Sequence, residues 1–200
     1  MRGRLIVFEG LNGSGKTTQA LMLVEALRNR GFKVEYTCEP TYGRIGDLIR
    51  LHVSRLKVRK PIYEALLFAA DRYEHVFREI KPKLRKGVIL VSDRYVYSSL
   101  AYQGAGGLSI EWLRSINSFA PKPDLTIYLD ISAEEALARK HKSTSRRTVF
   151  EGEKFQSRVR DIYLKLAEEE DFLKFEGAKP IKTIHREILR KVLRFLRETR

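Results

Sequence analysis

The segment that most constrains this chain is a glycine-rich loop close to its N-terminus. Residues 10–17 read GLNGSGKT and fit the pattern G-x-x-x-x-G-K-[ST]. The evenly apolar residues 5–8 precede the loop and predict a buried strand, whereas residues 16–30 carry Leu21, Val24 and Leu27 at helical spacing. A strand, this loop and a helix in that order predict a site for the phosphates of a nucleoside triphosphate.

The composition of the loop gives a physical reason for binding phosphate. Its glycines allow backbone conformations that turn successive N–H groups inward, and the helix that follows directs its positive end to the same place. Lys16 can reach the β- and γ-phosphates, and the hydroxyl of Thr17 can hold Mg²⁺. The residues that we expect to bind ATP are Gly10, Leu11, Asn12, Gly13, Ser14, Gly15, Lys16, Thr17 and Thr18.

Short apolar runs alternate with longer helical patterns along the rest of the chain. We expect strands at residues 5–8, 33–37, 88–91, 124–130 and, more briefly, 172–175. We expect helices at residues 16–30, 46–55, 61–85, 151–170 and 181–196, with shorter ones around Trp112 and from Ala133. The longest predicted helix has along its apolar side Leu66, Leu67, Ala70, Tyr73 and Phe77.

This alternation of strands and helices predicts an α/β fold. We expect the three-layer P-loop NTPase arrangement, with a mostly five-stranded parallel sheet, helices on both faces and a small lid. The length of 200 residues suits a single domain, so residues 1–200 are expected to form one unit. The loop alone does not name a reaction, because this fold serves kinases, switch GTPases and motor ATPases. The guanine-reading pattern Asn-Lys-x-Asp is absent from the sequence, which argues against a switch GTPase.

The chain is strongly basic, with 39 Lys and Arg against 25 Asp and Glu and a formal net charge of +14. Basic surfaces collect nucleic acid, but here the basic residues are spread along the chain, without a basic tail or an aromatic RNA-binding signature. Phosphorylated small substrates explain the sign of the charge equally well. We therefore expect no specific nucleic-acid partner, and a P-loop ATPase stimulated by nucleic acid is the alternative from another class.

The apolar stretches and the cysteine content bear on the compartment. No apolar stretch approaches the length that crosses a bilayer, so we expect no membrane partner. The N-terminus leads directly into the first predicted strand rather than into a secretory signal. The single cysteine, Cys38, cannot form an internal disulfide, which suits a reducing compartment. A cytoplasmic location is expected.

A series of short motifs follows the loop in a fixed order. The chain carries FEG at 8–10, EP at 39–40, LFAADR at 67–72 and DRY at 93–95. SSLAYQ comes next at 98–103 and PDLTIYLD at 123–130. In this order and spacing they resemble the thymidylate kinase family of nucleoside monophosphate kinases over nearly the whole chain. The resemblance implies Mg²⁺- and ATP-dependent phosphorylation of dTMP to dTDP by a homodimer.

The resemblance also implies a binding site for the acceptor nucleotide. It implies that the ring of Phe68 stacks on thymine and that Arg72, one helical turn away, donates hydrogen bonds to an exocyclic oxygen of the base. Tyr102 is expected to pack against the deoxyribose. The implied acceptor-binding residues are Glu39, Phe68, Arg72, Arg94, Ser99, Tyr102 and Gln103. Taken without the resemblance, the two residues favour a core position for Phe68 and a solvated helix charge for Arg72.

The catalytic residues implied by the resemblance come from two places. Arg94 would hold the acceptor's phosphate near the γ-phosphate, and Asp93 would help to organise acceptor and metal, although the two side chains alone fit a local ion pair. The basic segment at about 139–150 would form the lid, with Arg139, Arg146 and Arg147 as candidate catalytic arginines, although a solvated basic loop is the plainer interpretation. Lys16 completes the implied catalytic set.

Two positions depart from the family's pattern. Most relatives have aspartate where this chain has Asn12, and many have arginine where it has Cys38, for which Arg44 could substitute. These departures leave the assignment to kinases intact but affect the expectation that thymidylate is the preferred acceptor. The alternatives are a kinase of another nucleotide or of a deoxynucleoside, or a paralogue that binds nucleotides without efficient catalysis.

Overall fold

A computed structural model of the chain describes residues 3–55, 58, 60–143 and 152–198, without the side chains of 140–143. Within these residues, five strands form one all-parallel sheet in the order β2-β3-β1-β4-β5. The strands are β1 (Arg4–Gly10), β2 (Val34–Cys38), β3 (Ile89–Asp93), β4 (Leu125–Asp130) and β5 (Leu173–Glu176). The predicted α/β class and its five-stranded parallel sheet are confirmed.

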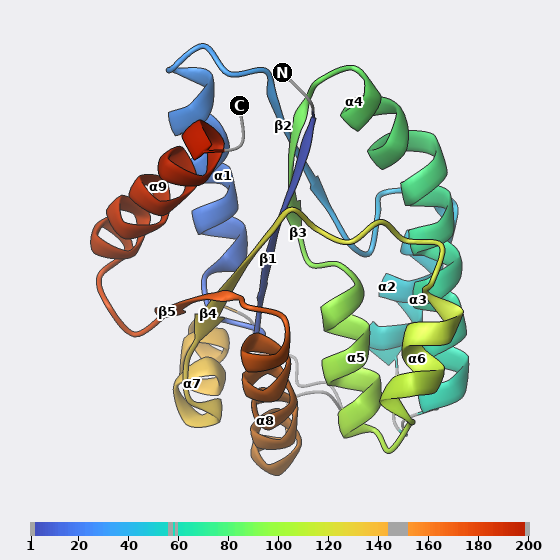
Figure 1. The fold of residues 1–200 in the computed structure, drawn as a ribbon. Coiled ribbons are helices and arrows are strands. Elements are labelled where there is room, and N and C mark those ends of the chain that lie inside the picture. Colours follow the sequence, from blue (N-terminus) through green and yellow to red (C-terminus); the bar gives the residue numbers. More distant parts are fainter. Residues whose placement is uncertain (1–2, 56–57, 59, 144–151, 199–200) are drawn as a thin grey trace.

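Two helices cover one face of the sheet. They are α1 (Lys16–Arg28) and α9 (Ile181–Glu198), which lie side by side in Figure 1 although they come from opposite ends of the chain. Both are amphipathic, and α9 buries Ile184, Ile188, Val192 and Leu196 against apolar residues of β1, β3 and β4. This cluster holds the first helix after the phosphate loop on the sheet, because it buries apolar residues of α1 together with those of the strands.

The helices on the other face come from the middle of the chain. α3 (Pro61–His75), a π-helical segment η1 (Val76–Ile80) and α4 (Lys81–Arg85) follow one another without a break, so the predicted helix at 61–85 is confirmed apart from its π-helical segment. α2 (Arg44–Arg55) packs on α3, and α5 (Val96–Ala105) lies between α3 and the later helices. α6 (Ile110–Ile116) packs on α5 (Figure 1).

The apolar side predicted for the long helix does not face the core. Leu66, Tyr73 and Phe77 are 50%, 53% and 45% exposed. The buried side of α3 instead combines small residues, such as Ala69, with polar residues, such as Arg72. Small side chains let this helix pack closely on its neighbours α2 and α5, and the polar ones find partners inside, as described below. The outer apolar stripe is therefore left uncovered in this single chain.

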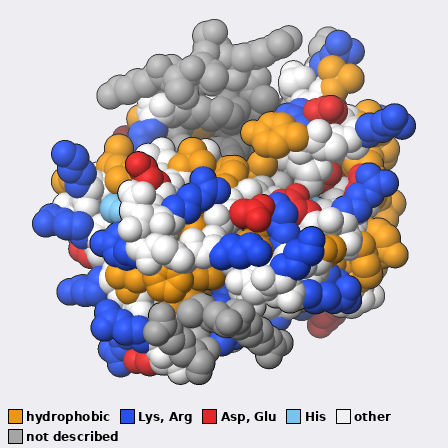
Figure 2. Space-filling view, turned by 90° about the horizontal axis from the view of Figure 1, so that it is seen from above, with side chains coloured by type: hydrophobic (Ala, Val, Ile, Leu, Met, Phe, Trp, Pro, Cys, Tyr) orange, Lys and Arg blue, Asp and Glu red, His pale blue; other side chains and the backbone are white. Residues whose placement is uncertain are grey.

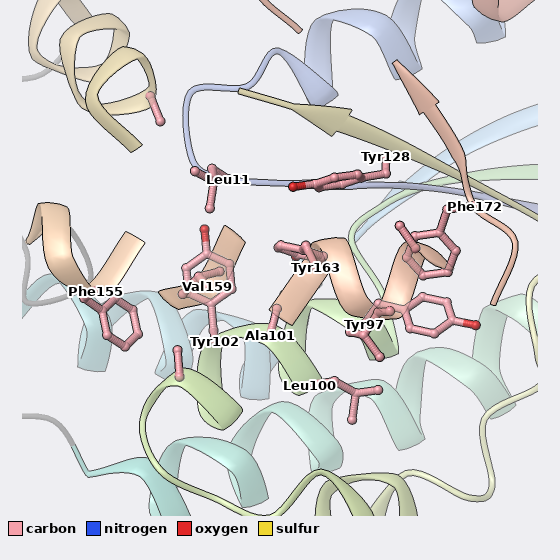
Figure 3. Close-up of a cluster of buried hydrophobic side chains, with 14 of the residues drawn as sticks. Leu11, Tyr97, Leu100, Ala101, Tyr102, Tyr128, Phe155, Val159, Tyr163 and Phe172 are labelled. Carbon is pink, nitrogen blue, oxygen red and sulfur yellow. The ribbon is translucent and has the colours of Figure 1, made fainter. Parts of the chain in front are cut away.

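A third set of helices gathers at the carboxyl ends of the strands. α7 (Ala133–Ser143) and α8 (Glu153–Glu169) pack against one another, and α8 also packs on α5. Figure 3 shows the buried cluster that joins these helices. Leu11 of the phosphate loop, Tyr128 of β4, Tyr102 of α5 and Tyr163 of α8 all point into it. The rings of Tyr128 and Tyr163 stack at 5.3 Å. Packed aromatic side chains thus hold the phosphate loop in place.

The register of the sheet decides where the loop lies. β1 pairs with β3 so that Phe8 is opposite Asp93, and the backbone N–H of Arg94 donates to the carbonyl of Phe8 at 2.9 Å. Both strands therefore end at the same edge of the sheet. The phosphate loop and the Asp93-Arg94 pair, which lie far apart in the sequence, emerge side by side.

The surface carries its charge in scattered form. Lys and Arg side chains are spread over the face shown in Figure 2, interspersed with hydrophobic and acidic ones. In the part of the chain that the structure describes, no helix is both long enough and apolar enough to cross a bilayer.

The packing of α9 gives a test of the fold. Ile188 is fully buried, so Ile188→Ala should lower the free energy of unfolding by about 2–5 kcal/mol, through lost transfer energy and the cavity left behind. Ile181 begins the same helix and is 56% exposed, so Ile181→Ala should change it by no more than about 0.5 kcal/mol. Urea unfolding followed by circular dichroism measures both. Equal losses would contradict the observed packing of α9.

Candidate active site

Two adjoining cavities open at the carboxyl edge of the sheet. The loop cavity, of about 490 Å³, is lined by the phosphate loop, Asp93 and Arg139. The side cavity, of about 320 Å³, is lined mainly by residues of α2, α3 and α5, with Phe68, Ser99, Tyr102 and Gln103 among them. Asn12 and Arg94 line both cavities. The structure therefore joins the two groups of predicted site residues at these two side chains.

The phosphate loop requires glycine at two positions for different reasons. Gly10 has φ +144°, and a Cβ there would lie 2.6 Å from the carbonyl oxygen of Leu129. Gly15 has φ +92° in open space and begins α1, so its need is conformational rather than steric. After Gly15 the first backbone N–H groups of α1, from Lys16 onward, face the loop cavity without helical acceptors. This arrangement suits an anion.

Lys16 lies inside the loop rather than in solvent. Its Nζ donates to the carbonyl of Leu11 at 2.7 Å, and the side chain is almost fully buried. Burial, and then the nearby charge of Arg94, lower the pKa of Lys16 to about 7, while Asp93 and Glu9 act in the opposite direction. Two cationic side chains are thus held close together where water is scarce. A bound phosphate would offset their repulsion.

Asp93 and Thr17 form the group that could hold a metal ion. The hydroxyl of Thr17 donates to Oδ2 of Asp93, whereas Oδ1 of Asp93 is buried and has no hydrogen-bond partner among the described residues. A buried carboxylate oxygen without a partner costs free energy. Hydroxyl and carboxylate oxygens are also the ligands that Mg²⁺ prefers. The residues present therefore fit a magnesium ion beside the loop.

Arg94 is held in an unusual backbone conformation. Its φ of +74° lies in the left-handed region, which is rare for a side chain of this size and occurs most often at functional sites. Its guanidinium donates to Oγ of Ser98 at 2.9 Å and to the side-chain oxygen of Asn12, and it lies over the ring of Tyr102 at 5.3 Å. These partners aim the charge at the junction of the two cavities.

Glu9 anchors this group, and no role for it follows from the sequence analysis. Its fully buried carboxylate accepts hydrogen bonds from the backbone N–H of Tyr95 at 2.9 Å, from Ser98 and from the hydroxyl of Tyr163 at 2.8 Å. Burial raises the pKa of Glu9, while Ser98 and then Arg94 oppose that shift. The signal in the sequence that could have indicated this role is an acidic residue at the end of an otherwise apolar strand.

The side cavity contains most of the predicted acceptor residues. Phe68 of α3 and Tyr102 of α5 line it together, and Ser99 and Gln103 are almost fully buried in its wall. Phe68 is only partly buried and faces the cavity, so it is not simply a core residue. A flat ring, a second aromatic ring and two hydrogen-bonding side chains form a slot that suits a flat ligand with polar edges.

Arg72 and Glu39 lie behind this wall rather than in it. Arg72 is 1% exposed, and its Nε donates to Oε2 of Glu39 at 2.8 Å. The rest of its guanidinium donates to the side chains of Asn117 at 2.5 Å and Ser99 at 3.1 Å. The solvated-charge interpretation of Arg72 is therefore wrong, because its charge is buried and satisfied. Arg72 reaches the side cavity through Ser99, and Glu39 is held in turn by His75 at 3.1 Å.

A different arginine lines the side cavity. Arg50 of α2 donates to the backbone carbonyls of Pro40 at 3.0 Å and Thr41 at 2.6 Å. No motif in the sequence points to it, since its position depends on how the loop after β2 folds back on α2. Arg44, the suggested substitute for the family arginine at position 38, lines a third cavity together with Cys38 and His75.

The candidate lid arginines are placed only in part. Arg139 of α7 lines the loop cavity and pairs with Glu135, one turn earlier on the helix, at 2.6 Å. Arg146 and Arg147 lie outside the described residues.

The chain is similar to known proteins over most of its length. A family model described as thymidylate kinase matches residues 8–188. A "probable thymidylate kinase" of Pyrococcus horikoshii is 48% identical over 94% of this chain and 95% of its own length. Proteins of the same name from Pyrococcus abyssi and Thermococcus kodakarensis are 51% identical over 84% of both chains and 45% identical over 92% of this chain and 94% of the relative. The chain belongs to the thymidylate kinase family.

Proposed function

We propose that this chain transfers the γ-phosphoryl group of ATP to dTMP, forming dTDP and ADP. The observation that carries the proposal is the pair Asn12 and Arg94, which line both the loop cavity and the side cavity. A donor nucleotide in the first cavity and an acceptor in the second would meet at these side chains. The names of the relatives support thymidylate as the acceptor.

The donor's phosphates would bind to the phosphate loop. The free N–H groups at the start of α1, and the glycines before it, would donate hydrogen bonds to phosphate oxygens from Gly10 to Thr18. Lys16 would exchange its bond to the carbonyl of Leu11 for a phosphate oxygen, and the anion would favour its charged form.

The metal site supports Mg²⁺ as the partner of ATP. Thr17 and Asp93 would hold the ion through the hydroxyl oxygen and the unpartnered carboxylate oxygen. Bound there, Mg²⁺ supplies charge neutralisation on the donor's phosphates. Asp93 also keeps the Thr17 hydroxyl oriented before any ligand arrives.

The acceptor would enter the side cavity with its base against Phe68. Stacking on this ring is tolerant of base identity, so the edge of the base must be read by polar side chains. Ser99 accepts a hydrogen bond from Arg72, which leaves its own hydroxyl proton free to be donated to a carbonyl of the base. Glu39 holds Arg72 in place, Gln103 adds a second polar group, and Tyr102 would pack against the deoxyribose.

Transfer would occur in one step at the junction. An oxygen of the dTMP phosphate bonds to the γ-phosphorus while the bond from that phosphorus to the β–γ bridging oxygen breaks, and the electron pair stays on ADP. Positioning and charge stabilisation account for this chemistry without a covalent intermediate. Arg94 and Lys16, which line the loop cavity, would supply positive charge to the phosphates. The lid segment at 139–150 would supply more, from Arg139, Arg146 or Arg147.

We further propose that the chain is a homodimer. The uncovered apolar stripe, formed by Ile62, Leu66 and Tyr73 of α3 and Phe77 of η1, supports this assembly, because exposed apolar patches of this kind mark protein–protein interfaces. Phe77 and Tyr73 already stack at 4.5 Å and so present a preformed aromatic surface. A second copy would bury the stripe against its own.

An acceptor panel tests the proposed reaction. With Mg·ATP, dTMP should be converted to dTDP with a higher kcat/KM than dCMP, dGMP or thymidine, because the polar edge of the base and the phosphate are both read. Product formation by chromatography, over a range of temperatures, measures each acceptor. A preference for another acceptor would reject thymidylate. ATP hydrolysis stimulated by DNA, without a nucleotide product, would reject the kinase.

Removal of the stacking ring tests the acceptor cavity. Phe68→Ala should raise the KM for dTMP by about tenfold or more, since base–aromatic stacking contributes about 1–3 kcal/mol. The KM for ATP should stay within about twofold, because Phe68 does not line the loop cavity. Steady-state kinetics with each substrate varied in turn separates the two. A larger effect on ATP would mean that the cavities are assigned to the wrong nucleotides.

Sedimentation tests the dimer. Leu66→Lys places a charge in the centre of the stripe and should shift the chain from dimer to monomer, since a buried unpaired charge is costly. The control is Leu21→Lys on α1, whose side chain is 48% exposed and lies outside the stripe. Analytical ultracentrifugation at several concentrations gives the mass of each. A wild-type monomer, or a dimer that withstands Leu66→Lys, would contradict the proposed interface.

A further inference from the structure

His75 is a buried histidine of α3 that lines neither the loop cavity nor the side cavity. Its Nε2 contacts the hydroxyl of Thr37 on β2 at 2.6 Å and lies 3.6 Å from Oε2 of Glu79 on η1. Its Nδ1 faces Oε1 of Glu39, the residue directly after β2, at 3.1 Å. Both ring nitrogens therefore have partners, and these fix the orientation of the ring.

The carboxylate of Glu39 joins this histidine to Arg72. Oε1 of Glu39 faces His75, and Oε2 accepts a hydrogen bond from Nε of Arg72 at 2.8 Å. A carboxylate paired with a guanidinium has no proton to donate, so Nδ1 of His75 carries the proton of their hydrogen bond. Loss of that bond would take a donor from a buried carboxylate oxygen, which is costly, and would free the carboxylate to rotate about its terminal bond.

Glu39 has the largest effect on where the guanidinium of Arg72 lies. The other acceptors around this guanidinium are the side chains of Asn117 and Ser99 and the backbone carbonyl of Tyr95. Among the described residues, Glu39 is the charged acceptor of the group. Hydrogen bonds between two charged groups are about twice as strong as those between neutral ones. A displaced Glu39 carboxylate would therefore displace Arg72.

Arg72 connects this buried group to the side cavity. Its Nη2 donates to Oγ of Ser99 at 3.1 Å, and Ser99 lines that cavity. A guanidinium has only donors, so the hydroxyl of Ser99 accepts from Arg72 and directs its own proton elsewhere. A carbonyl on a base suits such a hydroxyl, whereas an amino group, which is itself a donor, does not. A chain of hydrogen bonds therefore runs from His75 through Glu39 and Arg72 to the side cavity.

We propose that His75 is a positioning residue for selection of the base. By donating to Glu39 it holds the carboxylate that fixes Arg72, and Arg72 in turn keeps the hydroxyl of Ser99 a donor toward the base. The inference rests on the proposed function in one respect, namely that the side cavity takes a pyrimidine nucleotide. It adds a residue outside both cavities on which the preference for a carbonyl over an amino group on the base depends.

Two substitutions at position 75 separate the roles of the two ring nitrogens. The amide nitrogen of the shorter side chain in His75→Asn can take the place of Nδ1 and donate to Glu39. The longer side chain in His75→Gln reaches the place of Nε2 and contacts Thr37 instead. Calorimetry would measure the affinity of the full-length chain for dTMP and for 5-methyl-dCMP. The second ligand keeps the methyl group of dTMP and carries an amino group in place of its C4 carbonyl.

The parent chain should bind dTMP more tightly than 5-methyl-dCMP. His75→Gln should reduce this preference about fivefold, which is the effect of one hydrogen bond. His75→Asn should keep the preference within about twofold of the parent's. A merely structural role for the histidine would make the two variants behave alike, so rescue by asparagine alone identifies the bond to Glu39 as the one that acts.

A third variant breaks the same chain one step later. An amide has one acceptor oxygen where a carboxylate has two, so the side chain in Glu39→Gln cannot accept from both His75 and Arg72. It should therefore reduce the preference for dTMP as well. This variant leaves the histidine in place, and so it tests the chain of hydrogen bonds even where His75→Gln does not fold.

The controls separate selectivity from stability. Ile188→Ala lowers stability from α9, on the opposite face of the sheet to α3 (Figure 1), and should keep the parent's preference. His185→Gln on the same helix is the matched histidine substitution and should leave both affinities unchanged. Melting curves set the temperature of titration below the unfolding of each variant, since the variants at position 75 should also melt earlier than the parent.

The outcomes separate the inference from the function. The inference is overturned by a parent chain without the preference, by equal effects of His75→Gln and His75→Asn, or by an unchanged preference in Glu39→Gln. If the predicted binding pattern appears but the parent chain forms no dTDP from Mg·ATP and dTMP, the proposed reaction fails and the positioning role of His75 stands. If the parent forms dTDP and the variants keep its preference, the reverse holds.

Discussion

The parallel pairing of β1 with β3 is the constraint on which the site depends. With Phe8 opposite Asp93, both strands end at one edge of the sheet, and the turn after each is forced into the same small volume. Glu9, the next residue of β1, then accepts hydrogen bonds from the start of α5 and from α8. One buried carboxylate thus ties together the elements that carry the phosphate loop, Arg94 and Tyr102.

The consequence of this arrangement is a buried group of charges with few degrees of freedom. Lys16, Arg94, Asp93 and Glu9 lie close together, and burial acts on the pKa of Lys16 and on the pKa of Glu9 more strongly than any neighbouring group does. Backbone carbonyls, hydroxyls and one amide hold the cations in place. The geometry for an anion therefore exists before the anion arrives, which is the condition for effective electrostatic stabilisation.

Local patterns in the sequence predicted the sheet and the loop, because both depend on spacing or on strand ends, whereas only the family resemblance implied the grouping of Phe68 with Tyr102. They failed where tertiary contacts decide. Hydrophobicity alone assigned Leu66 and Tyr73 to the apolar side of the long helix, but the core side is chosen by close approach, which favours Ala69. Arg50 has no local signal, and Glu9 has only its acidic character at the end of an apolar strand, because their roles depend on how other segments fold against them.

Arg72 shows what burial of a charge means for a binding site. Its guanidinium is enclosed by side chains of the chain itself, those of Glu39, Asn117 and Ser99. The free-energy cost of removing that charge from water therefore belongs to folding of the chain and not to binding of a nucleotide. Substitutions around Arg72 should therefore change the free energy of unfolding before they change nucleotide binding. At the side cavity, the hydroxyl of Ser99 keeps a fixed direction, so that using it in binding costs little entropy.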